Sequence, residues 1–159
     1  MTVEDYINKL SESYKSKLIY FHNLHLDLFN KSKGSISKHQ SWVGGYRDHL
    51  EQILKIAYVL YQNFSFPFSF DSVFLVLYFH DIEKLFKYSS GILIDKNKYL
   101  FEDLVKYNII FSKEEVNALK YVHGEGNDYC SDRIMNELAG FCHACDVISA
   151  RTFHDRTKI

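Results

Sequence analysis

The sequence predicts an all-α protein, a compact single-domain bundle of roughly six to seven helices. Apolar residues recur at intervals of three and four along most of the chain, which is the periodicity of amphipathic helices rather than of strands. One proline in 159 residues leaves these helices largely uninterrupted. A hydrophobic share of 47% and a charged share of 25% are typical of a globular protein. This length suits one domain, expected over residues 1–159.

The N-terminal part is expected to contain a long helix, a loop and a second helix. Apolar positions at helical spacing predict one helix over residues 3–29. The segment NKSKGSISKHQSW, residues 30–42, loses this spacing and gathers Ser, Lys and Gly, which favours a long loop. Loops of this length in a compact domain are usually functional or mobile. The clearest amphipathic pattern follows over residues 46–61, with His49 on the buried face.

The next expected helix contains the most apolar run of the chain. Pro67 ends the preceding segment, and residues 73–86 have the length and composition of a buried helix. This helix is expected to include His80 and Asp81, which follow the apolar run VFLVLYF directly.

The C-terminal half is expected to be helical after a turn or short extended excursion at residues 89–97. Ser112 and Glu115 have the spacing of a capping box, which opens a helix. A polar loop with two glycines is expected at residues 124–132, and the tail TFHDRTKI is too short and polar to be expected to order. Further helices are expected over residues 100–107, 112–122 and 133–151.

Charge and composition exclude several classes of function. A net charge of −1 provides no basic surface of the kind that duplex nucleic acid requires, so no such partner is expected. No apolar run approaches the length of a membrane span, and the N-terminus has no signal-peptide pattern. Three cysteines, an odd number, fit reduced thiols. A cytoplasmic protein is expected, and homo-oligomers are common among such proteins.

Buried polar residues point to a metal site. Burying an imidazole and a carboxylate without partners costs several kcal/mol, about 2–7 for a neutral group, so His80 and Asp81 require one. The expected helices also direct His49 and Asp146 inward. Two imidazoles and two carboxylates suit a divalent ion such as Mn²⁺, Fe²⁺, Co²⁺, Ni²⁺, Zn²⁺ or Mg²⁺. On an ideal helix, adjacent residues point about 100° apart, so this pair is expected to straddle the edge of a cleft.

The order of these residues resembles the HD-domain superfamily of metal-dependent phosphohydrolases. His49 in GGYRDHLEQIL is similar to the family's first histidine, YFHDIEK resembles its hydrophobic-HD-x-x-K signature, and Asp146 in CDVISAR resembles its final aspartate. The resemblance covers about residues 46–151, which would be the motif-bearing core. A second dipeptide, His154–Asp155, has no apolar run before it.

The resemblance implies that His49, His80, Asp81 and Asp146 bind a metal ion that activates water for attack on phosphorus. It also suggests catalytic roles for further residues. Lys84 lies where members often contact phosphate, although a solvated surface amine is equally compatible. Glu83 replaces a common glycine, and could act as acid or base, support a ligand histidine, or lie exposed. The catalytic residues implied are Asp81, Glu83, Lys84 and His123.

His123 has a position at which two-metal members carry a further histidine, so it could bind a second ion or donate a proton. His143 is expected to pack or hydrogen-bond behind the site. Cys142 and Cys145 form a CxxC pair without a second pair, which favours buried apolar side chains over a zinc site.

Substrate contacts are expected mainly from the loop before His49. Trp42 could stack on a base or anchor the loop, and cations near it could bind phosphate. The residues expected to bind substrate are Lys38, Trp42, Arg47, Lys84 and Arg151; Arg133 is a weaker candidate.

The sequence therefore predicts a phosphohydrolase that cleaves a nucleotide or a related small phosphoester. Two alternatives stay open: a phosphodiesterase for cyclic or short oligonucleotides, and a non-catalytic nucleotide-binding module that keeps the metal site. One bound ion per chain would favour the first enzyme, and two ions would favour the phosphodiesterase.

Overall fold

Helix α5 (Phe70–Phe79), which is buried over most of its length, runs through the middle of the protein. The computed structural model describes residues 1–153, so most of the expected tail and the His154–Asp155 pair lie outside the described residues. Every residue from Val73 to Phe79 in α5 is buried. Helices α4 (Gly45–Asn63), α8 (Lys113–Tyr121) and α9 (Glu137–Thr152) pack against it. Residues 1–153 contain helices and no strand, which confirms the all-α prediction.

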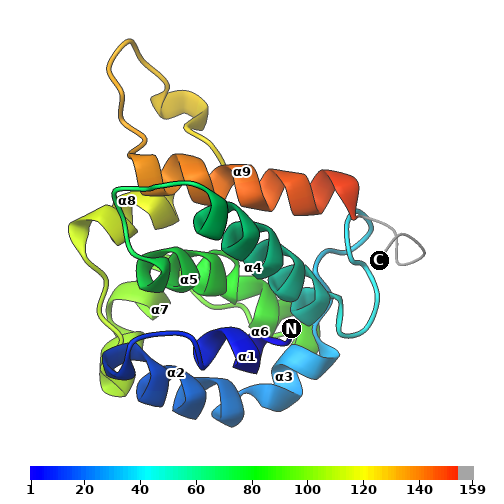
Figure 1. The fold of residues 1–159 in the computed structure, drawn as a ribbon. Helices are drawn as coiled ribbons and strands as arrows, with labels where there is room; N and C mark the ends of the chain where they lie inside the picture. The colour runs from blue at the N-terminus through cyan, green and yellow to red at the C-terminus, as the bar shows by residue number, and fades with distance from the viewer. Residues whose placement is uncertain (154–159) are drawn as a thin grey trace.

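Three helices form a layer on one side of this centre (Figure 1). They are α1 (Val3–Ile7), α2 (Glu12–Leu24) and α3 (Leu26–Lys31). The prediction of one continuous helix over residues 3–29 is therefore wrong. The hydroxyl and backbone N–H of Ser11 donate to the Asp71 carboxylate at 2.6 and 3.2 Å, so a contact with the start of α5 fixes a new helix start there.

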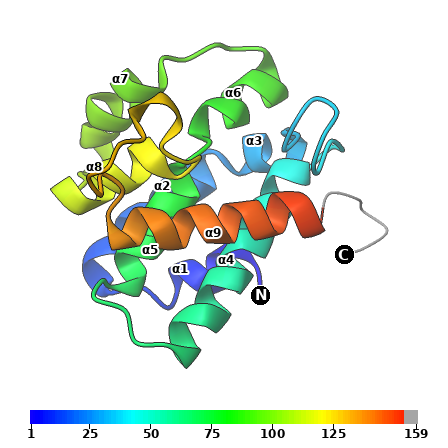
Figure 2. The same cartoon turned by 90° about the horizontal axis from the view of Figure 1, so that it is seen from above.

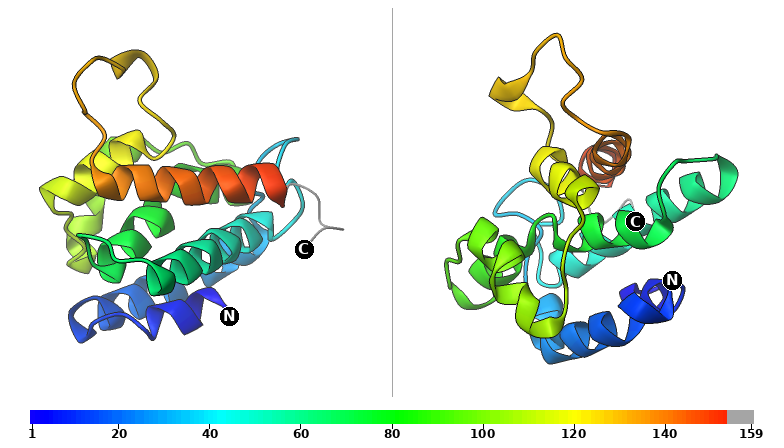
Figure 3. Two further views of the ribbon diagram at one scale, coloured as in Figure 1. Left: turned by 45° about the horizontal axis from the view of Figure 1, so that its top comes forward. Right: turned by 90° about the vertical axis from the view of Figure 1, so that its left-hand side faces the viewer.

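The remaining elements lie between α5 and α9 in the sequence. They are α6 (Ile82–Ser90), α7 (Lys96–Phe101), the 3₁₀ helices η1 (Asp103–Tyr107) and η2 (Gly126–Asp128), and α8. The capping box of Ser112 and Glu115 is present at the start of α8, as the sequence predicts. Of the nine α-helices within residues 1–153, six have nine residues or more. The segment between α8 and α9 extends away from the bundle (Figure 3).

Helix α9 lies across α4 and α5 on the side opposite α1–α3 (Figures 1 and 2). Asn136 caps its N-terminus by accepting a hydrogen bond from the Ala139 N–H, so α9 begins four residues later than expected. The buried side chains of these helices form one hydrophobic core. No helix in residues 1–153 combines the length and apolar character that crossing a membrane requires.

The expected helix over residues 73–86 is interrupted at the His80–Asp81 pair, so this prediction is also wrong. Helix α5 ends at Phe79 and α6 begins at Ile82. The backbone of Asp81, at φ −122° and ψ 27°, is not α-helical. The His80 and Asp81 side chains therefore need not point about 100° apart, as they would on an ideal helix, and both can face one site.

The segment between α3 and α4, residues 32–44, has no helix, in agreement with the expected loop. Gln40 anchors this loop to the rest of the protein. This residue is fully buried and has a positive φ of 44°, which an L-residue rarely adopts. Its backbone carbonyl accepts a hydrogen bond from the Gly34 N–H at 2.9 Å. A Cβ on Gly45 would lie 2.0 Å from the same oxygen, so only glycine fits beside Gln40.

Gly45→Ala is expected to destabilise the protein by about 1–3 kcal/mol, because its methyl group must displace the Gln40 carbonyl. Urea unfolding followed by circular dichroism measures the change. Gly140→Ala in α9 is the matched control, since a Cβ there would lie 3.8 Å from the Met135 sulfur, an ordinary contact. The control should be neutral or stabilising by up to about 1 kcal/mol. Equal effects of the two substitutions would contradict the packing described for Gln40.

Candidate metal centre

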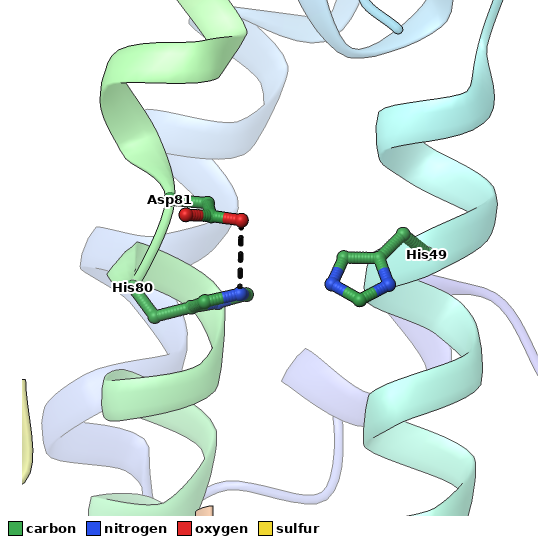
Figure 4. Close-up of side chains that lie close together, drawn as sticks. All are labelled: His49, His80 and Asp81. Atoms are coloured by element: carbon green, nitrogen blue, oxygen red, sulfur yellow. Dashed lines mark ion pairs between the residues drawn. The ribbon is translucent and has the colours of Figure 1, made fainter. Parts of the chain in front are cut away.

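The interrupted helix directs His80 and Asp81 toward the same point. Nε2 of His80 lies 3.2 Å from Oδ2 of Asp81, and both residues are buried. His49 faces them from α4, as Figure 4 shows. Atoms of His49, His80 and Asp81 that could bind a metal ion lie within 4.8 Å of one another.

Helix α9 supplies the fourth expected ligand. Oδ1 of Asp146 lies 3.1 Å from Nε2 of His49 and 3.7 Å from Nε2 of His80. The side chain of Asp146 is 13% exposed, so the acid closes the site on the side of α9. The structure thus brings together all four residues that the sequence selected as metal ligands.

His123 lies at the open edge of this group. It follows α8, and its Nε2 is 3.4 Å from Oδ1 of Asp81 and 3.8 Å from Oδ2 of Asp146. His80, His123 and Asp146 form a second, overlapping group that could bind an ion. The side chain of His123 is 49% exposed, in contrast to the buried His49 and His80. The site therefore has a dry inner side and a side that faces solvent.

Hydrogen bonds on the far side of each ring determine which nitrogen can bind a metal. Nδ1 of His80 donates to the Leu77 carbonyl at 2.7 Å, because a carbonyl oxygen can only accept. Nδ1 of His49 lies 3.0 Å from the Ser149 hydroxyl. In both residues Nε2 is the nitrogen directed into the site. Metal-binding histidines characteristically use the second nitrogen in this way.

The polar atoms inside the site lack hydrogen bonds, which favours a cation between them. Nε2 of His49, Nε2 of His80 and Oδ1 of Asp81 are buried without a hydrogen-bond partner among residues 1–153. Each Nε2 nonetheless lies close to a carboxylate oxygen, at 3.1 Å from Asp146 for His49 and at 3.2 Å from Asp81 for His80. Leaving three such atoms unsatisfied would cost about 1–3 kcal/mol each. The donor set of nitrogen and oxygen atoms therefore fits a divalent ion.

The carboxylates of Asp81 and Asp146 favour a protonated, positively charged His80 when no metal is bound. Burial lowers the pKa of His80, but the Asp81 and Asp146 carboxylates raise it to about 10. Burial raises the pKa of Asp81, but His80, His123 and Lys84 bring it well below its usual range. The pKa of Asp146 is likewise lowered, against the effect of burial, by His49 and His80. In the metal-free protein, the positive charge of protonated His80 thus compensates the two carboxylates in place of a metal ion.

Lys84 lies directly beside this group. Its ammonium donates to Oδ2 of Asp81 at 2.5 Å, and its side chain is 25% exposed, so it is not a solvated surface amine. Oε2 of Glu83 is a buried atom that lies 3.8 Å from the Lys96 ammonium. Lys96 also donates to the His80 carbonyl and so supports the interrupted helix. The structure places Lys84 in contact with a candidate ligand and Glu83 beside a second lysine.

Two of the expected substrate residues line a cavity next to the site. Lys38, Arg151, His39 and Ala150 surround a hollow of about 340 Å³. The ring of His39 packs on His49 with centroids 5.0 Å apart, so this cavity borders the candidate metal centre. A larger hollow of about 510 Å³ between α7 and α8 contains none of the candidate ligands.

Other expected substrate residues have structural partners. Nε1 of Trp42 donates to Asp48 at 2.6 Å, which ties the loop to the first turn of α4. The Arg47 guanidinium donates to both oxygens of Glu4, and also to Glu51 and Asn30. Arg47 therefore joins α4 to α1, and the structure does not bring it to the candidate ligands as the sequence suggested.

The other candidates behind the site have the expected structural roles. Nδ1 of His143 donates to the Val122 carbonyl at 2.7 Å, which fixes the residue before His123. Cys142 and Cys145 are free thiols and buried, and neither belongs to a metal-binding group within residues 1–153. Burial raises the pKa of the Cys145 thiol to about 12, so it is protonated at neutral pH.

Three residues that contact the site were not predicted from the sequence. His39 packs on His49, Ser149 hydrogen-bonds to the same ring, and Lys96 binds the backbone of His80. Only His39 had a signal in the sequence, as a histidine in the loop next to Lys38. Serine and lysine side chains have no pattern that distinguishes such a contact from solvent exposure.

Comparison of the chain with protein-family models, curated proteins and solved structures gave no match. The class of site is therefore defined by its own residues: a buried histidine and aspartate group that could hold a metal ion.

Metal binding is expected to release about one proton per ion at pH 7–8, because Nε2 of His80 must lose its proton to act as a ligand. His80 is protonated at any pH below its pKa of about 10. The affinity for the metal ion should therefore rise about tenfold per pH unit up to that pH and then level off. Calorimetry in two buffers of different ionisation enthalpy measures the release. A heat of binding independent of the buffer at pH 7.5 would contradict the assignment of this proton.

Proposed function

We propose that this protein is a metal-dependent phosphohydrolase of the HD-domain type that cleaves a nucleotide or a related small phosphoester. The observation that carries the proposal is the convergence on one buried point of ligand atoms from His49, His80 and Asp81 that have no hydrogen-bond partner in the described residues. Asp146 closes the set from α9. The ordered motif supports the same class, because His80, Asp81 and Lys84 have the family's signature spacing.

The four ligands would hold a divalent ion such as Mn²⁺, Fe²⁺, Co²⁺, Ni²⁺, Zn²⁺ or Mg²⁺. The chemistry that such an ion supplies when bound is a water of lowered pKa, able to attack phosphorus at neutral pH. Lys84 would contribute positive charge next to Asp81, where a phosphate oxygen could share it. His123, half exposed at the open edge, is in a position to exchange a proton with a leaving group.

The cavity beside the site supports an anionic substrate. Lys38 and Arg151 provide two cationic side chains on its wall, and His39 connects it to His49. Cations arranged around a hollow are typical of phosphate recognition. A nucleotide could extend from the candidate ligands into this cavity and place a phosphate near Lys38 and Arg151.

A phosphodiesterase for cyclic or short oligonucleotides is the second candidate. The overlapping group of His80, His123 and Asp146 favours it, because a second ion could bind there. Two-metal sites are common in enzymes that cleave phosphodiesters. Metal analysis separates the candidates: one ion per chain supports the first function and two ions support the second.

Asp81→Asn is expected to reduce metal-dependent turnover by at least about 10³-fold, because the amide keeps the shape but loses the charge that binds the ion. The assay is product chromatography from nucleoside mono-, di- and triphosphates and from cyclic and linear dinucleotides, each with Mn²⁺, Co²⁺, Ni²⁺, Zn²⁺ or Mg²⁺. The product names both the bond and the substrate class.

Asp128→Asn is the matched control, since Asp128 pairs with Lys120 at 2.8 Å on the surface and should leave turnover unchanged. Nucleotide binding without turnover under every metal would reject the hydrolase and favour a non-catalytic binding module.

Lys38→Met is expected to raise KM about tenfold with little change in kcat, because it removes a cation that would contact the substrate away from the reacting bond. Steady-state kinetics on the substrate found above measures both constants. Lys33→Met controls for the loss of one positive charge, since Lys33 is exposed on the same loop and does not line the cavity. An equal rise of KM in both variants would indicate general electrostatic attraction rather than a contact from Lys38.

A further inference from the structure

A row of hydrogen-bonded side chains connects the loop before α4 to a candidate metal ligand. Nδ1 of His39 lies 2.7 Å from Oε1 of Gln40, and Nε2 of Gln40 donates to Oε1 of Gln52 at 2.8 Å. The Ser149 hydroxyl lies 3.2 Å from the same Gln52 oxygen and 3.0 Å from Nδ1 of His49. We call the three residues between the two histidines, Gln40, Gln52 and Ser149, the amide relay.

A backbone carbonyl determines the direction of the first hydrogen bonds. Gln40 lies 2.9 Å from the carbonyl oxygen of Phe153, which can only accept. The amide group of Gln40 that faces this oxygen is therefore its NH₂, and the second N–H points to Gln52. Because Oε1 of Gln40 is then an acceptor, Nδ1 of His39 must be the donor.

The same reasoning continues along the amide relay to the metal ligand. Gln52 must present its oxygen to Gln40, since turning its amide would bring two NH₂ groups together. The Ser149 hydroxyl donates its one hydrogen to that oxygen. The Ser149 oxygen is then left to accept from His49, so Nδ1 of His49 carries the hydrogen and Nε2 keeps its lone pair.

The position of Gln40 at the start of the amide relay is fixed by its surroundings. It is fully buried, and its backbone adopts a positive φ of 44° between Gly34 and Gly45. Such a conformation in a residue other than glycine costs about 1–3 kcal/mol, and it persists only where surrounding contacts impose it. The strain therefore places the Gln40 amide where it reaches Gln52 and Phe153 together.

We propose that Gln40 is a positioning residue that fixes His49 in the tautomer able to bind a metal ion, acting through Gln52 and Ser149. This inference rests on the proposed metal site for its purpose, but the tautomer itself is a property of the metal-free protein. Nε2 of His49 lies 3.1 Å from Oδ1 of Asp146, and this carboxylate, which can only accept, favours a hydrogen on Nε2 in the metal-free protein. The amide relay opposes that preference, because a hydrogen on Nε2 would leave no lone pair there for a metal ion.

Gln40→Glu is the decisive variant, because it replaces two donor hydrogens with at most one. The Phe153 carbonyl and the Gln52 oxygen can then no longer both be satisfied unless the Gln52 amide turns. A turned Gln52 donates to Ser149, whose hydroxyl then donates to Nδ1 of His49. His49 is thereby switched to the tautomer with hydrogen on Nε2.

Gln52→Glu is the matched control. It introduces the same change of charge next to the same residues, but a carboxylate at this position still accepts from both Gln40 and Ser149. Nε2 of Gln52, which this change removes, has no hydrogen-bond partner in the described residues. The direction of the amide relay is therefore preserved.

The experiment combines two measurements on each variant. Long-range ¹⁵N–¹H NMR of the histidine side chains in the metal-free protein at pH 8, above the ordinary histidine pKa of about 6.5, identifies the tautomer of His49. Titration with Co²⁺ alone, followed by its visible absorption, gives metal affinity. We expect Gln40→Glu to move the hydrogen to Nε2 and weaken Co²⁺ binding about 10–100-fold, and Gln52→Glu to do neither.

The inference is overturned if His49 keeps its hydrogen on Nδ1 in Gln40→Glu, or if both Gln→Glu variants behave alike. Should the Gln40→Glu variant fail to fold, Ser149→Ala tests the same step, because it removes the acceptor for Nδ1 of His49 and should leave a mixture of tautomers. Unchanged NMR signals of His49 in Ser149→Ala would reject the role of the amide relay. If the tautomers shift as expected but Co²⁺ does not bind the wild-type protein, the proposed function fails and the amide relay stands.

Discussion

Buried ligand atoms without hydrogen bonds are the constraint on which the rest of the structure depends. Nε2 of His49, Nε2 of His80 and Oδ1 of Asp81 lie in the interior without hydrogen bonds to any of residues 1–153. Burying such atoms is unfavourable unless a cation lies between them. In the metal-free protein the carboxylates satisfy this requirement by raising the pKa of His80. A divalent ion would satisfy it with more charge and several coordinate bonds at once.

Several features of the fold follow from this constraint. The apolar helix α5 stops at Phe79, which frees His80 and Asp81 from the geometry of a continuous helix. The Lys96 ammonium then binds the backbone carbonyl of His80, just past the end of α5. Outside the site, the Leu77 carbonyl holds the His80 imidazole and Ser149 holds that of His49, so the directions in which both Nε2 atoms point are set before an ion arrives.

The proposed catalytic role, as opposed to a purely structural ion, rests on the asymmetry of the site. A structural ion is typically enclosed by protein ligands on all sides. Here the inner side is dry, while His123 is half exposed and a cavity with two cations adjoins His49 through His39. A hollow lined by two cations therefore lies next to His49, where it could receive the proposed substrate.

The sequence by itself determined the helical class, the capping box at Ser112 and the four candidate ligands. Each of these depends on periodicity or on short-range order, which a linear pattern records. The tertiary structure alone decided the break at Asp81, the pairing of Arg47 with Glu4 and the contact of Gln40 with Phe153. These depend on partners far apart in the chain, 113 residues in the last case. A polar side chain takes the partner that folding brings within reach, and spacing along the sequence does not encode that distance.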